Sequence, residues 1–132
     1  MRRSKILVCD DDDMIVQIIT SKLRGEGFEV ATVGSGRDVL RKLRASVPDL
    51  LIIDAVMPGI GGAEVLEAIR ADTRLKRLPV MILSAKRDPE FIATVVRLGV
   101  SDYVAKPFAL AELAKRVKKL VAAKPEDEYV LD

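Results

Sequence analysis

Polar residues that could hold a metal ion or accept a phosphoryl group end four separate apolar runs of this sequence. Asp10 and Asp11 follow KILVC, Asp54 follows LLII, Ser84 follows VMIL, and Lys106 follows YVA. Carboxylates held close together repel one another unless a cation lies among them, and Mg²⁺ is a hard cation that favours such oxygen ligands. A carboxylate can also act as a nucleophile and form an acyl phosphate, while an ammonium and a hydroxyl bind the phosphoryl oxygens.

The elements that must position these residues can be read from apolar periodicity. Short apolar runs predict buried strands at 5–9, 28–33, 50–53, 80–83 and 103–105. Helical spacing predicts helices at 14–24, after Ser35, after Gly61-Gly62, from Asp88-Pro89 to Gly99, and at 110–121. Strands that alternate with helices predict an α/β fold, a doubly wound five-stranded parallel sheet of order 2-1-3-4-5 that is flavodoxin-like, with five helices. In that order the polar residues of the four runs meet at one carboxyl edge of the sheet.

Composition limits the function classes. The 132 residues suit one domain, expected at 1–122, with a charged tail at 123–132 that we expect to be unstructured. The net charge of +2 does not indicate a nucleic-acid partner. Histidine, the commonest general base, is absent. The single cysteine, Cys9, lies in an apolar run and is expected to be a core residue in a reducing, cytoplasmic compartment; no run is long enough to span a membrane.

Four motifs in order resemble the receiver domain of two-component response regulators: ILVCDDDD, LLIIDAVMPGIGG, VMILSA and DYVAKPF. The resemblance extends over roughly residues 5–121. It implies that Asp54 accepts a phosphoryl group from a histidine kinase or phosphotransfer protein. It also implies a signalling domain that is not an enzyme for other substrates, although it catalyses its own phosphorylation and dephosphorylation.

The resemblance also assigns the metal. Asp10 and Asp11 would organise Mg²⁺, with Asp11, Asp54 and the backbone carbonyl of Val56 as direct ligands. The pairing of Asp10 with Asp11, rather than of Asp11 with Asp12, rests on the alignment with the preceding strand. Gly61 and Asp13 depart from the residues usual at their positions, and neither belongs to the proposed chemistry.

The remaining roles concern the phosphoryl group and the output. By resemblance, Ser84 and Lys106 contact the phosphoryl oxygens, the Lys106–Pro107 bond is cis, and Tyr103 is the switch aromatic. Val56 and Lys86 flank the site, and neither can activate the water that hydrolyses the acyl phosphate, so we expect a long-lived phosphoprotein. Partner binding or self-association is expected on the face formed by the fourth helix, the fifth strand and the fifth helix.

Two rival functions stay open at this point. A phosphohydrolase of the haloacid dehalogenase type would use Asp10 as nucleophile and Asp12 as acid, but Asp13 and Met14 stand where its motif has other residues. A degenerate receiver would act only as a binding module. The last helix carries four basic residues that could mark a nucleic-acid patch: Lys115, Arg116, Lys118 and Lys119. A solvated helix face is the better interpretation, so we expect no direct contact with nucleic acid or membrane.

Overall fold

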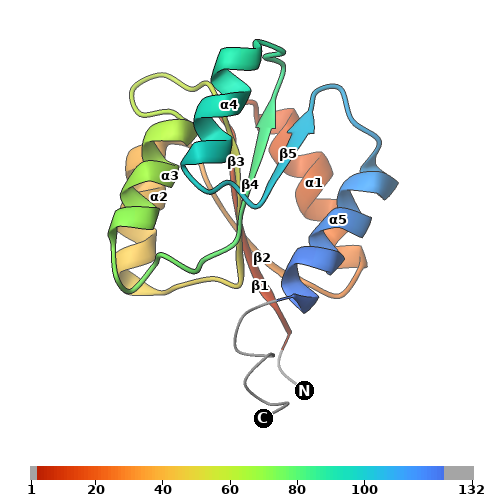
Figure 1. The fold of residues 1–132 in the computed structure, drawn as a ribbon. Helices are drawn as coiled ribbons and strands as arrows, with labels where there is room; N and C mark the ends of the chain where they lie inside the picture. The colour runs from red at the N-terminus through yellow and green to blue at the C-terminus, as the bar shows by residue number, and fades with distance from the viewer. Residues whose placement is uncertain (1–2, 124–132) are drawn as a thin grey trace.

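The computed structural model describes residues 3–123, so the expected tail lies outside the described residues except for Ala123. Strands and helices alternate along the chain (Figure 1). The strands are β1 (Lys5–Cys9), β2 (Glu29–Val33), β3 (Leu50–Asp54), β4 (Val80–Ser84) and β5 (Asp102–Ala105). The helices are α1 (Asp13–Gly25), α2 (Gly36–Ala45), α3 (Gly62–Ala71), α4 (Pro89–Arg97) and α5 (Leu110–Ala122).

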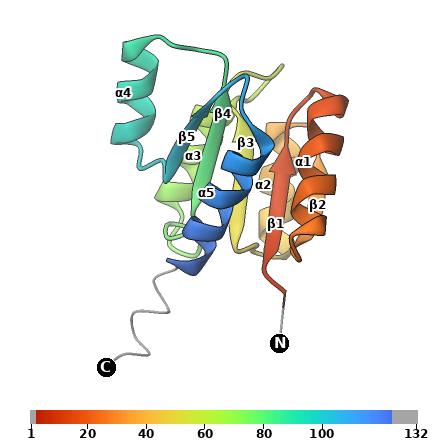
Figure 2. The same ribbon diagram turned by 90° about the vertical axis from the view of Figure 1, so that its right-hand side faces the viewer.

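The five strands form one parallel sheet in the order β2-β1-β3-β4-β5, which confirms the predicted topology. Helices α2, α3 and α4 lie on one side of the sheet, and α1 and α5 lie on the other (Figures 1 and 2). Every residue of β3 and β4 is buried, because helices cover both faces of these central strands. The site residues at the ends of β1, β3, β4 and β5 therefore share one edge.

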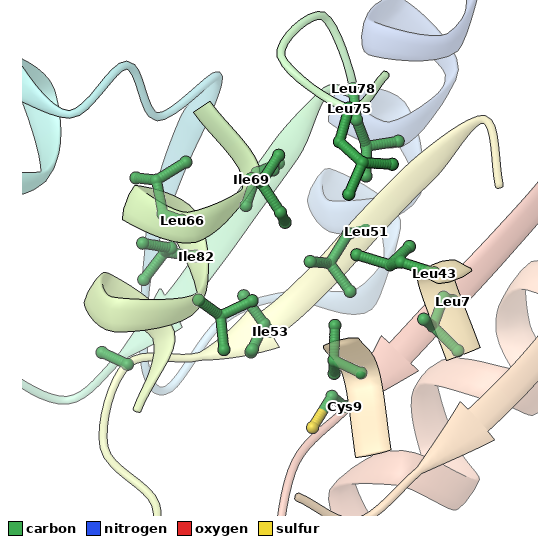
Figure 3. Close-up of a cluster of buried hydrophobic side chains, with 14 of the residues drawn as sticks. Leu7, Cys9, Leu43, Leu51, Ile53, Leu66, Ile69, Leu75, Leu78 and Ile82 are labelled. Carbon is green, nitrogen blue, oxygen red and sulfur yellow. The ribbon is translucent and has the colours of Figure 1, made fainter. Parts of the chain in front are cut away.

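The core consists of two aliphatic layers. Leu51 and Ile53 of β3 point towards α2 and α3, where they meet Leu43, Leu66 and other buried side chains (Figure 3). The alternate residues of β3 pack into the layer beneath α1 and α5. Cys9 lies in the first layer, where its thiol donates to Met57 Sδ at 3.6 Å. Burial, reinforced by the charge of Asp10, raises the pKa of this thiol to about 12, so Cys9 is a core residue rather than a reactive one.

Side-chain caps begin three helices, two of them at the residues that the sequence predicts. Ser35 caps α2 and Asp88 caps α4, with Pro89 as the first residue of that helix. The first helix begins at Asp13, one residue earlier than expected. Asp12 is its N-cap, and its carboxylate accepts hydrogen bonds from the N–H groups of Met14 and Ile15.

Charge is distributed in the same way along all five helices. Each has an acidic residue in its first turn: Asp13, Asp38, Glu64, Glu90 and Glu112. Each has a basic residue in its last turn: Lys22 and Arg24, Lys42 and Arg44, Arg70, Arg97, and Lys119. Both placements stabilise the helix, because the peptide dipoles leave partial positive charge at its start and partial negative charge at its end. No helix within residues 3–123 combines the length and apolarity needed to cross a membrane.

Thr20 offers a test of core packing. It is a buried residue of α1, and its hydroxyl has no hydrogen-bond partner within the described chain. Thr20→Val keeps the shape and removes an unsatisfied polar group, so we expect the free energy of unfolding to rise by about 1 kcal/mol in urea titrations. Thr94 is the matched control, because its hydroxyl donates to the carbonyl of Glu90 at 2.9 Å. A Thr94→Val variant should gain nothing, and an equal gain in both variants would show that the unsatisfied hydroxyl is not the cause.

Candidate functional site

Three carboxylates meet at the carboxyl edge of the sheet. Asp10, Asp11 and Asp54 each offer one oxygen, and these oxygens lie within 4.8 Å of one another. Asp10 and Asp54 are buried and Asp11 is exposed, so the cluster is open to solvent on one side. Hard oxygen ligands with room for retained water are the donor set that Mg²⁺ favours. The residues that the sequence predicted as carboxylate ligands are thus close enough together to fit this ion.

Lys106 connects two of the carboxylates. Its Nζ lies 2.9 Å from Asp10 Oδ2 and 3.5 Å from Asp54 Oδ1. Burial alone would lower the pKa of Lys106, but its hydrogen bond to Asp10 and the charges of Asp10 and Asp54 raise it above the usual value. Lys106 is therefore a fixed positive charge beside Asp54. The Lys106–Pro107 peptide bond is cis, as expected.

Asp54 has an unusual electrostatic environment for a carboxylate. Its side chain is held at the end of β3 with only 8% of the residue exposed. Burial and the neighbouring charge of Asp10 raise its pKa, against the lowering effects of Lys106 and the backbone N–H of Val56. The ionised form is therefore destabilised by its surroundings, and a cation among the three carboxylates would relieve that destabilisation.

The run of four aspartates divides into different structural roles. Asp10 Oδ1 accepts a hydrogen bond of 2.9 Å from the N–H of Asp12, and Asp10 Oδ2 receives Lys106. Asp12 uses its own carboxylate to cap α1, and Asp13 begins that helix. Asp10 and Asp11 thus face the cluster with Asp54, whereas Asp12 is committed to the helix.

The loop after β3 accounts for the departure at Gly61. A Cβ atom on Gly61 would lie 2.6 Å from the carbonyl oxygen of Ala55, and one on Gly62 would lie 2.7 Å from that of Asp54. The loop therefore folds directly onto the backbone of the Asp54 strand end, where a side chain has no room. Val56, at the start of this loop, is 55% exposed and so lies where water reaches the site.

Ser84 and Tyr103 lie on neighbouring strands and are connected through one residue. Ser84 is buried at the end of β4, and its Oγ accepts a hydrogen bond of 2.9 Å from the N–H of Lys86. The hydroxyl of Tyr103, on β5, donates to the carbonyl of Lys86 at 2.8 Å. The Lys86 ammonium lies 4.7 Å from the ring centroid of Phe91, on α4.

Sequence reasoning missed two features of this region. It did not single out Phe91, whose ring meets the Tyr103 ring edge to face. The scarcity of aromatic residues, only 4% of the chain, was the signal that could have drawn attention to it. It also took Ile18 only as part of a helical pattern. Ile18 is in fact 43% exposed and lines an apolar groove beside Lys106, together with Ile15, Ala85, Pro107, Phe108 and Leu110. Helical spacing alone does not distinguish a buried face from an apolar surface.

Many known proteins are similar to this chain in sequence or in structure. A model of the response regulator receiver domain matches residues 6–118. The DNA-binding response regulator MtrA of Mycolicibacterium smegmatis is 40% identical over 116 residues, covering 88% of this chain and 50% of that protein. The phosphate regulon transcriptional regulatory protein PhoB of Rhizobium meliloti is 37% identical over 123 residues, covering 92% and 54%. This chain thus spans about half the length of these curated relatives.

A solved structure agrees with the observed architecture. The crystal structure of a putative response regulator from Chloroflexus aurantiacus superimposes with a TM-score of 0.86 and 36% sequence identity, covering 92% of this chain and 99% of that one. The DNA binding named for MtrA is a property of that whole regulator. The expectation that the present chain makes no direct contact with nucleic acid stays a prediction.

Proposed function

Because the chain belongs to the response regulator receiver domain family, we propose that it is a phosphoacceptor signalling domain in which Asp54 takes a phosphoryl group from a histidine kinase or phosphotransfer protein with Mg²⁺. The observation that carries this proposal is the cluster at the carboxyl edge. There, one ammonium contacts both Asp10 and Asp54, and three carboxylates lie within reach of a single ion. The buried free thiol of Cys9 suits a reducing cytoplasm.

The proposed reaction forms one bond and breaks one. An oxygen of the Asp54 carboxylate attacks phosphorus, and the bond from phosphorus to the imidazole nitrogen of the donor breaks, its electron pair staying on the imidazole. Lys106 holds a positive charge beside Asp54, and the Ser84 hydroxyl can donate to a phosphoryl oxygen. Asp10, Asp11, Asp54 and the carbonyl of Val56 would hold Mg²⁺, which when bound neutralises charge on the phosphoryl oxygens.

An apolar surface beside the cluster suits a phosphoryl donor. Met14 is 68% exposed on α1, and the apolar groove lined by Ile18 and Phe108 borders Lys106. Asp54 is nearly buried, so a donor must bring its imidazole to this edge of the sheet and be held there. An exposed apolar groove next to a reactive group is a suitable contact for a protein partner.

The hydrolase alternative is less compatible with the site. Asp10 would be its nucleophile, but both of its carboxylate oxygens already accept hydrogen bonds, from Asp12 and Lys106. Asp12 would be its acid, but its carboxylate caps α1. The test is incubation with acetyl phosphate and Mg²⁺ followed by mass-spectrometric mapping. We expect one added phosphoryl group on the peptide that contains Asp54, and modification of Asp10 instead would support the hydrolase.

The lifetime of the acyl phosphate is a further expected property. The exposed Val56 side chain cannot hydrogen-bond an attacking water, and a charged Lys86 cannot accept its proton. Val56→Asn together with Lys86→Glu should speed the loss of phosphate by up to about 100-fold in a decay assay after removal of the donor.

Two further variants assign that effect. Val56→Asn alone separates the two contributions, because Lys86→Glu also removes the contact with Phe91. Val47→Asn changes an exposed valine in the loop between α2 and β3 and should leave the decay unaltered. Unchanged decay in the double variant would show that neither residue controls the lifetime.

The hydrogen bond between Ser84 and Lys86 suggests how phosphorylation of Asp54 would change the surface that binds a partner. A hydroxyl drawn towards a phosphoryl group changes the segment between β4 and α4 and frees space for the Tyr103 ring. Phosphorylation would thereby alter the face formed by α4, β5 and α5, on which we place partner binding or self-association. A charged hydrogen bond contributes about 1.5–3 kcal/mol, so two new contacts approach the 5.5 kcal/mol or so that reverses a 1:99 equilibrium.

A further inference from the structure

The backbone of Lys86 joins the two side chains of the proposed switch. Its N–H donates to Ser84 Oγ at 2.9 Å, and its carbonyl accepts from the Tyr103 hydroxyl at 2.8 Å. Movement of Ser84 away from this position either carries the Lys86 peptide with it or breaks the first bond. The second bond transmits the same displacement to Tyr103. A single residue therefore stands between the phosphorylation site and the output face.

The side chain of Lys86 fastens that peptide to α4. Its ammonium lies 4.7 Å from the centroid of the Phe91 ring, which is within the range of a cation–π interaction. The Phe91 ring in turn meets the Tyr103 ring edge to face, with centroids 6.5 Å apart and an interplanar angle of 63°. The backbone of Lys86 thus contacts Tyr103, its side chain contacts Phe91, and the two rings contact each other, so the three residues form one cluster.

Little of α4 is fully buried. Of its nine residues, only Val95 is buried, and Val96 lies exposed on the outer surface. The C-terminal end of the helix is fixed, because the Arg70 guanidinium donates to the carbonyl of Gly99 at 2.8 and 3.1 Å. The contact between Lys86 and Phe91 lies at the opposite end of the helix, where the Phe91 ring also packs against the buried core.

We infer that Lys86 and Phe91 form a latch that holds the segment 85–88 and the start of α4 in the arrangement seen here, in which Asp54 is an unmodified carboxylate paired with Lys106. The inference rests on the proposed phosphorylation of Asp54. Lys86 and Phe91 act as positioning residues, since they make no contact with the reacting carboxylate and act through Ser84 and Tyr103. The latch must open before Tyr103 turns, so its strength sets how readily phosphorylation switches the output face.

The latch predicts a change in affinity at a distance. Contacts that exist only before modification oppose it, so their removal raises the apparent affinity for a phosphoryl mimic at Asp54. Beryllofluoride with Mg²⁺ is the probe, and its half-saturation is followed by backbone NMR. Phe91→Leu and Lys86→Met should each lower the half-saturating concentration by about two- to fivefold, the worth of an exposed cation–π contact. The signals of residues 91–105 and of α5 should shift together with those around Asp54.

The sign of the effect separates the latch from a purely electrostatic role of Lys86. Lys86→Met removes a positive charge near an anion, so long-range electrostatics alone predicts weaker binding, whereas the latch predicts tighter binding. Lys86→Arg keeps the cation over the ring and should bind as wild type does. Lys76→Met removes a comparable exposed charge from the loop before β4 and is the distal control.

The outcomes are distinguishable from failure of the proposed function. If wild-type protein neither binds beryllofluoride nor accepts a phosphoryl group from acetyl phosphate, the proposed phosphorylation is wrong. If wild type binds and the two variants bind equally well or more weakly, the latch is wrong while the phosphoacceptor function stands. Lower thermal stability with unaltered half-saturation would assign Lys86 and Phe91 a packing role only, and would likewise overturn the inference.

Discussion

We expect the Asp54→Asn variant to incorporate no measurable phosphoryl group from acetyl phosphate in the presence of Mg²⁺, a loss of about 1000-fold or more. The amide that replaces the carboxylate has no anionic oxygen to attack phosphorus, and it is a poorer Mg²⁺ ligand. Lys106 and Ser84 keep their positions after β5 and at the end of β4 but have no acyl phosphate to contact. The measurement is intact mass together with a time course of label incorporation.

Two controls make this result interpretable. Burial and the charge of Asp10 raise the pKa of Asp54, so folding favours its protonated form. Ionised Asp54 therefore lowers stability above its folded pKa, and this loss disappears as the pH falls through that pKa. The Asp54→Asn variant should then be at least as stable as wild type at pH 7 in EDTA. Asp13→Asn, at the start of α1, should label normally, and persistent labelling of Asp54→Asn would indicate Asp10 as the acceptor.

The second large effect concerns the metal. Asp11→Ala removes an exposed carboxylate from the cluster, and we expect the Mg²⁺ concentration for half-maximal phosphorylation to rise at least tenfold. Mutation of a residue that only orients a metal ligand commonly lowers metal affinity 10- to 100-fold. Loss of a direct ligand should lower the affinity by at least as much. Titration of the phosphorylation rate with Mg²⁺ measures the change, and at saturating Mg²⁺ the labelled residue should still be Asp54.

Asp12 provides the matched comparison, because its carboxylate lies next to Asp11 in the sequence but caps a helix instead of facing the cluster. It accepts hydrogen bonds from Met14 and Ile15 as the cap of α1, so Asp12→Ala should lower the free energy of unfolding by about 1 kcal/mol. Its Mg²⁺ requirement should stay near that of wild type. If Asp12→Ala instead shows the larger Mg²⁺ effect, the assignment of Asp11 as the ligand is off by one residue.

Much of the fold was predictable because the central strands are buried on both faces. Runs such as LLII and VMIL have no polar position, which sets them apart from the amphipathic helices around them. Alternation of strands and helices then indicated a doubly wound sheet, whose order 2-1-3-4-5 placed Asp10, Asp54, Ser84 and Lys106 together at one edge. The juxtaposition of site residues was therefore a consequence of chain order and strand ends.

What could not be predicted depends on contacts between distant segments. Lys86 and Phe91 lie in a loop and on a helix, and no periodicity indicates that one covers the ring of the other. Ile18 belongs to an apolar pattern yet is 43% exposed, because it lines an open groove and does not pack into the core. Gly61 looked like a simple departure, and only the close approach of Ala55 accounts for it. Each case needs the three-dimensional neighbour, which local sequence does not contain.

The acidic first turns and basic last turns of the five helices affect how a partner molecule approaches the domain from solution. All five run antiparallel to the strands, so their acidic first turns gather at the carboxyl edge and their basic last turns at the opposite edge. A net charge of only +2 conceals this separation. Over a Debye length of about 8 Å at physiological salt, such a field orients incoming molecules before contact. A partner whose binding surface has a cationic rim would more often arrive with that surface facing Asp54. This gain in association rate disappears as ionic strength rises.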